Sequence, residues 1–151
     1  MRLGTRIAAA ALTSGVLVTT AACGATARGS DGYTREAGAY AAAGGSAAAS
    51  GALSARLWLR DLAFTRYTDV AVTSSEDDLA TVHDSFAAIQ PPTEADVATY
   101  DALDALLADA GDALTGLRIA LRQGRSEEVA AAAEQLAGSA EELQDFAEDR
   151  S

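Results

Sequence analysis

The chain has 151 residues, a length that is enough for one domain, and its formal net charge is −11. About a quarter of the residues are alanine, lysine and asparagine are absent, and only two prolines occur, a composition that favours helix over sheet. The negative charge repels phosphates, which argues against nucleic-acid binding and against membrane attachment through surface charge.

The first 22 residues have the three zones of an export signal. Arg2 and Arg6 make the start positive, residues 7–18 are apolar, and small residues follow. The apolar stretch is about a dozen residues long, whereas about 20 are needed to span a bilayer as a helix. We therefore expect residues 1–22 to be a signal peptide and not a transmembrane anchor.

The single cysteine, Cys23, follows this leader directly. The segment that ends in Cys23 resembles the bacterial lipobox, in which small residues precede a cysteine that is diacylated and becomes the first residue of the mature protein. Ala21 and Ala22 fit this pattern, whereas Thr20 stands where the family usually has leucine. The resemblance implies a lipid anchor at Cys23 on the outer face of the cell membrane. Plain secretion is the alternative, because cleavage after Ala27 would discard Cys23.

Residues 23–51 consist mainly of glycine, alanine, serine and threonine with scattered charges. They show no periodic face of large apolar residues, so we expect a flexible tether and not part of a packed core. Such a coil has an average span of about 30 Å. It would lift a domain clear of the lipid headgroups.

Residues 52–149 carry the signals of a helical bundle domain. Apolar residues crowd the stretch from 52 to 89, which predicts either one long helix or two helices with a break near Ser74. Pro91 and Pro92 end that unit, and Thr93 is placed to cap the next helix. The expected fold is all-α, an antiparallel up-down bundle of three long helices, or four if the first is broken near Ser74.

The second and third units carry the apolar seams on which this bundle rests. The first seam ends at Gly124, as expected of a glycine just beyond a helix, and the second follows Ser126. The first seam consists of Tyr100, Leu103, Leu107, Ala110, Leu114, Leu117 and Leu121, and the second of Val129, Leu136, Ala140, Leu143 and Phe146 with Ala147.

One short stretch interleaves arginines with aromatic residues: Arg56, Trp58, Arg60, Phe64 and Tyr67. On a single helix these side chains share one face. Tryptophan, tyrosine and arginine dominate the hot spots of protein interfaces, so one interpretation is a partner-binding patch. The other is that the arginines pair with acids of neighbouring helices while the rings fill the core.

Candidates for metal binding or catalysis are weak. His83 is the only histidine and has Asp84 beside it, but no spacing typical of a zinc site surrounds them. The acidic residues are expected to form a solvated face; weak divalent-cation binding around residues 76–78 or 141–145 is the alternative. We find no catalytic or cofactor motif, and we expect neither an enzyme nor a bound cofactor.

The whole pattern of leader, low-complexity segment and small lysine-free bundle resembles the small uncharacterised lipoproteins of streptomycetes and related actinobacteria. The resemblance is one of architecture and carries no catalytic residues. It implies a non-enzymatic interaction or accessory module, whose partner would be another cell-envelope protein. A small-ligand or divalent-cation-binding lipoprotein is the alternative function.

Overall fold

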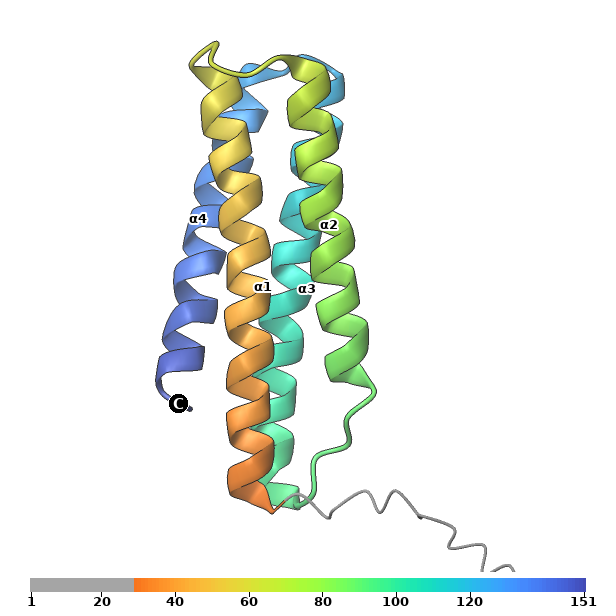
Figure 1. Ribbon diagram of the computed structural model, residues 1–151, viewed down its shortest axis with the longest axis vertical. Coiled ribbons are helices and arrows are strands. Elements are labelled where there is room, and N and C mark those ends of the chain that lie inside the picture. Colours follow the sequence, from red (N-terminus) through yellow and green to blue (C-terminus); the bar gives the residue numbers. More distant parts are fainter. Residues whose placement is uncertain (1–28) are drawn as a thin grey trace, which may run out of the picture.

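The computed structural model describes residues 29–151, which form four α-helices joined by short connections (Figure 1). The helices are α1 (Ser30–Leu59), α2 (Thr65–Ala87), α3 (Glu94–Arg122) and α4 (Ser126–Glu148). Each helix runs antiparallel to the next, with α1 between α2 and α4 and contacts also between α1 and α3. The predicted all-α helical bundle is confirmed, in its four-helix form.

The largest difference from expectation concerns the segment predicted to be a tether. The prediction is wrong for residues 30–51, which form most of α1 and lie inside the bundle, so the domain begins near residue 30 and not at 52. The remainder of that segment, residues 23–28, lies outside the described residues, as do the predicted signal peptide and Cys23.

Small residues give α1 its buried face. Small residues recur along α1 at alternating intervals of four and three residues, which is the spacing of an apolar helical seam. The residues in this seam are Ala37, Ala41, Gly44, Ala48, Gly51 and Ala55, all buried. Alanine and glycine bury little surface by themselves, but they let a neighbouring helix approach closely and place its own large side chains against the α1 backbone.

The leucines of α3 use this space. A Cβ atom on Gly44 would overlap Cδ2 of Leu107, and one on Gly51 would come within 2.5 Å of Cδ2 of Leu114. Both leucines are fully buried. The two glycines and the two leucines are each seven residues apart, so the same contact is repeated two helical turns further along.

The predicted seams of the later helices are confirmed. Every seam residue of α3 is buried except the half-buried Tyr100, and α4 buries its predicted residues except the half-buried Ala140. Gly124 has a φ of 66°. The N–H groups of Gly124 and Arg125 donate to the carbonyl oxygens of Leu121 and Ala120, which is the hydrogen-bond pattern of a Schellman helix end.

The first predicted unit is broken at a different place from the one expected. The chain leaves the helix at residues 60–64, whereas Ser74 lies within the continuous helix α2. Asp61 adopts a φ of 58°, in the left-handed region that ends many helices. The N–H groups of Asp61 and Leu62 donate to Trp58 and Leu57, so a second Schellman end forms here with aspartate in place of glycine.

A buried carboxylate fastens the start of α1 to the start of α3. Asp96 is only 4% exposed and accepts hydrogen bonds from the hydroxyls of Ser30 and Thr93. These hydroxyls, Ser30 first, lower the pKa of Asp96. Thr93 occupies the predicted N-cap position, although its hydroxyl donates to Asp96 and does not receive a backbone N–H. The contact fixes the end of the bundle at which residue 29 enters, called the base below.

We expect Gly44→Ala to lower the free energy of unfolding by about 1–3 kcal/mol, because the added methyl overlaps Cδ2 of the buried Leu107 and forces that side chain to shift. Gly116→Ala is the matched control. Gly116 lies in α3 with no atom within 4 Å of an added Cβ, so alanine should raise stability by up to about 1 kcal/mol through helix propensity. Urea unfolding followed by circular dichroism measures both. Equal stabilisation by the two substitutions would contradict the close packing of α1.

Candidate functional site

An exposed apolar surface lies at the end of the bundle opposite the base, where α1 turns into α2 (Figure 1). It consists of Leu62, Phe64, Tyr67 and Val70, whose exposed fractions are 69%, 88%, 67% and 69%. We call these four residues the tip surface. Scattered exposed apolar residues are common on proteins, whereas four within nine residues of one turn make this surface a candidate binding site.

The turn itself is held in place by local contacts. The indole Nε1 of Trp58 donates a 3.0 Å hydrogen bond to Oγ1 of Thr65, which ties the end of α1 to the start of α2. Trp58 is half-buried and packs against the core. Together with the helix end at Asp61, this hydrogen bond fixes the positions from which Leu62 and Phe64 project.

The five residues of the predicted partner-binding patch have different surroundings. Arg56 pairs with Glu134 of α4 at 3.4 Å, and Trp58 packs against the core, as the alternative interpretation expects. Phe64 and Tyr67 do not fill the core. Arg60 is exposed and makes no ion pair with the other described residues. The single helical face expected for the patch is wrong, because the helix breaks at residues 60–64, so that Phe64 is the N-cap of α2 and Tyr67 lies within α2.

Arginines gather at the tip end of the bundle. Of the eight arginines in residues 29–151, six lie near the α1–α2 and α3–α4 turns, which occupy the same end (Figure 1). They are Arg56, Arg60, Arg66, Arg118, Arg122 and Arg125. Because most acids lie elsewhere on this strongly acidic chain, the tip surface has a more positive surrounding than the rest of the domain.

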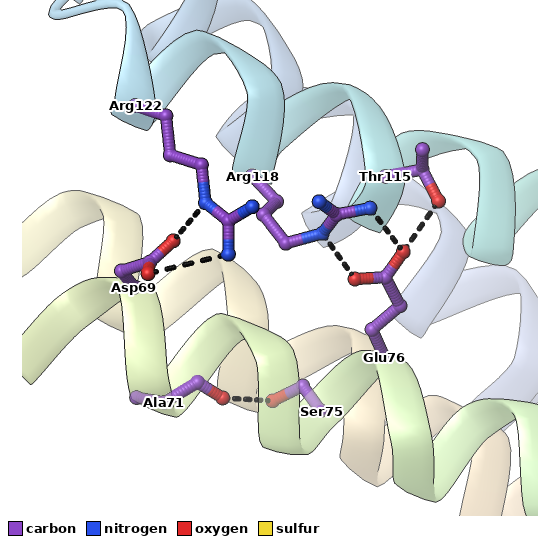
Figure 2. A network of polar contacts seen from close by, with 7 residues as sticks. All are labelled: Asp69, Ala71, Ser75, Glu76, Thr115, Arg118 and Arg122. Atoms are coloured by element: carbon purple, nitrogen blue, oxygen red, sulfur yellow. Dashed lines mark hydrogen bonds and ion pairs between the residues drawn. The ribbon is translucent and has the colours of Figure 1, made fainter.

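Two ion pairs hold the first half of α2 on α3, beside the tip surface (Figure 2). Glu76 accepts hydrogen bonds from Arg118 at 2.6 and 3.2 Å and from the hydroxyl of Thr115 at 2.7 Å. Two turns nearer the tip, the carboxylate of Asp69 accepts hydrogen bonds from Arg122 at 2.8 and 3.4 Å. The Glu76 pair is mostly shielded from solvent, whereas the Arg122 side chain is half exposed.

These contacts favour the charged form of Glu76. The hydrogen bonds from Arg118, and after them the one from Thr115, lower the pKa of the Glu76 carboxyl from its ordinary value of 4.5, against the opposing effect of burial. A lowered carboxyl pKa stabilises the folded state above the unfolded pKa. That contribution is lost as the pH falls through the folded pKa.

His83 and Asp84, the two weak metal-binding candidates, lie in different surroundings. Nε2 of His83 lies 2.7 Å from Oδ1 of Asp104, so the imidazole pairs with α3, while Asp84 is exposed. Within residues 29–151 no three histidine, cysteine or acidic side chains are grouped closely enough to hold a metal ion. The acidic residues 76–78 do not converge on one site either, because Glu76 pairs with Arg118 whereas Asp77 and Asp78 are exposed to solvent.

Comparison with protein-family models, curated proteins and solved structures finds no match to this chain. No helix within the described residues has the length and apolar character needed to cross a membrane. Functional inference therefore depends on the residues themselves. The sequence indicated part of the tip surface through its arginine and aromatic pattern, but it did not indicate that Leu62 and Val70 belong to it.

We expect Glu76→Gln to lower the free energy of unfolding at neutral pH by about 1–2 kcal/mol, because it removes the charge that Arg118 and Thr115 stabilise. The deficit should shrink as the pH falls below 4.5, because the carboxyl of the unfolded chain then binds a proton and that of the folded wild type follows at a lower pH. Urea titrations at several pH values measure the difference. Asp77→Asn is the control, since Asp77 is exposed and unpaired among the described residues; an equal effect there would contradict the role of the pair.

Proposed function

We propose that this protein is an extracytoplasmic lipoprotein, anchored at Cys23, whose four-helix bundle is a non-enzymatic interaction module. In this proposal the bundle binds its partner through the tip surface. The observation that carries it is the exposure of Leu62, Phe64, Tyr67 and Val70 together at one end of the fold. The resemblance to small actinobacterial lipoproteins is consistent with such a role.

The energetics of apolar exposure support this assignment. Each large apolar side chain left in water forgoes about 1.5–3 kcal/mol that burial would provide. Most other leucines of the described residues are buried, including Leu103, Leu107, Leu114, Leu117 and Leu121 of α3, whereas Leu53 of α1 is 58% exposed and stands apart from the turn. A partner that covers the tip surface would gain this free energy, and an aromatic ring such as Phe64 supplies a large contact area at small cost in side-chain entropy.

The positions of Cys23 and of the tip surface at opposite ends of α1 also support the proposed interaction module. Cys23 precedes the base by a few residues, whereas the tip surface is one helix length away. With 30 residues in α1, this separation is about 45 Å at 1.5 Å per residue. An anchor at Cys23 therefore leaves the tip surface free to meet a partner.

We expect Cys23→Ser to move the protein from the membrane fraction to the soluble fraction, because the diacylated sulfur is the only proposed attachment. Immunoblotting of fractionated cells measures the shift, and mass spectrometry of the wild-type amino terminus identifies the acyl chains. A wild-type chain that is soluble and begins at Arg28 would show ordinary secretion and overturn the anchor.

For the binding site, we expect a photo-crosslinking amino acid at position 64 to give discrete adducts in intact cells, because Phe64 is the most exposed residue of the tip surface. The matched control is position 119. Ile119 is also exposed, at 41%, but lies on α3 outside the tip surface. Adducts are separated by mass and identified by peptide sequencing. Labelling at 119 with none at 64 would contradict binding through the tip.

A further inference from the structure

We propose that the tip surface is one end of a longer docking surface, and that its partner contributes an amphipathic helix with acidic residues at one end and basic residues at the other. The inference rests on the proposed function, because it names the chemistry of the partner for the same site. Three features of one side of the bundle carry it: an apolar strip that continues from the tip, a middle section of small side chains, and a change in the sign of the exposed charges along α2.

The surface concerned is the outward side of α1 and α2, which lie next to each other in Figure 1 and which we call the α1–α2 face. Two contacts between the helices show which residues lie at the same level. Trp58 is hydrogen-bonded to Thr65 at the tip, and Ala43 and Thr81 line one groove nearer the base. In both pairs the residue numbers add up to nearly the same value, so residues of α1 and α2 with that sum lie side by side in this antiparallel pair.

Apolar exposure continues from the tip along this face. Leu53 is 58% exposed and stands two heptads from Ala39, which lines grooves on both sides of α1 and therefore lies on its outward ridge. The level of the two helices places Leu53 beside Ala71 and so close to Val70. Five of the seven large apolar side chains that residues 29–151 expose thus form one strip. They are Leu53, Leu62, Phe64, Tyr67 and Val70.

The middle of the α1–α2 face consists of small side chains. Ser50 and Ser74 are exposed at the same level, and α1 carries no charged residue between Glu36 and Arg56. The hydroxyl of Ser50 already donates to the carbonyl oxygen of Ser46 at 2.8 Å, so a partner can cover it without leaving a donor unpaired. Nearer the base the face continues as an apolar groove of about 350 Å³ between the two helices. Small side chains let another backbone approach closely, so this elongated face accommodates a third helix along its length.

The exposed charges of α2 change sign along its outward side. Arg66 lies at the tip end, and Asp77 and Asp84 follow after 11 and 18 residues, which are close to three and five full turns. Asp78 is exposed beside Asp77, and Arg60 is exposed at the tip end of α1. None of these five side chains makes an ion pair with another described residue. A helix with acids over the arginines and basic residues over the aspartates therefore has the complementary pattern.

The remaining charges at the tip do not oppose this pattern. Asp61 lines a pocket that Ser126 of α4 also lines, so its carboxylate lies on the α4 side of the turn and off the α1–α2 face. A second copy of the chain does not fit the face, because the exposed Asp77 and Asp78 of the two copies would meet near its middle. The same two carboxylates repel an anionic bilayer. The partner expected here is therefore a different protein.

Two synthetic peptides test the charge pattern. Both are helices of about 20 residues, the length of the face, and share one composition with leucines on one side and no tryptophan. In the segregated peptide glutamates precede lysines, and in the mixed peptide they alternate. We expect the purified full chain carrying Cys23→Ser to bind the segregated peptide at least about tenfold more tightly. The fluorescence of Trp58, the only tryptophan, measures binding beside the tip. Equal binding of both peptides, or of neither, overturns the inference.

Charge reversal on the protein locates the binding. Arg66→Glu should weaken binding of the segregated peptide at least about tenfold, because its acids then meet a like charge. Arg35→Glu is the matched control: it changes the net charge equally, but Arg35 lines the groove on the α4 side of α1. Circular dichroism shows that both variants are folded. Equal losses in the two variants contradict the inference, and a Trp58 response to anionic vesicles in place of the segregated peptide overturns it in favour of lipid.

Two crosslinking positions test the geometry in cells. Photo-crosslinkers at positions 64 and 74 should label one segment of one partner protein, at points about ten residues apart, because two helices side by side advance equally per residue. Adducts at 64 with none at 74 overturn the docked helix and leave the interaction module standing. Adducts at neither position overturn both proposals. Two points of attachment at that spacing, together with the preference for the segregated peptide, support both.

Discussion

The fold depends on the close approach of α3 to α1, in which fully buried leucines lie directly on glycines. Gly44 and Gly51 leave the space that the ends of Leu107 and Leu114 occupy, because a single methyl group on either glycine would collide with them. Glycine inside a helix costs about 1 kcal/mol relative to alanine. The cost is offset here because the leucines become fully buried.

This constraint explains which parts of the fold could be predicted from the sequence. The seams of α3 and α4 were predicted correctly because they contain large apolar residues, mainly leucines in α3 and leucines with Val129 and Phe146 in α4, whose spacing shows the buried side directly. The seam of α1 has the same spacing but consists of alanine and glycine, which are equally typical of flexible segments. Periodicity measured on large side chains alone therefore assigned residues 30–51 to a tether, although they complement the large residues of α3.

The stretch that follows was left open by the sequence. Phe64 and Tyr67 could have filled the core or formed a binding patch, and in the structure they are exposed around the turn together with Leu62 and Val70. The deciding residue is Asp61, whose left-handed conformation ends α1 where no glycine announces a turn. Once the helix ends there, α2 is held by its contacts with α3 at Glu76 and Asp69, and the bundle has no further helix to cover these side chains.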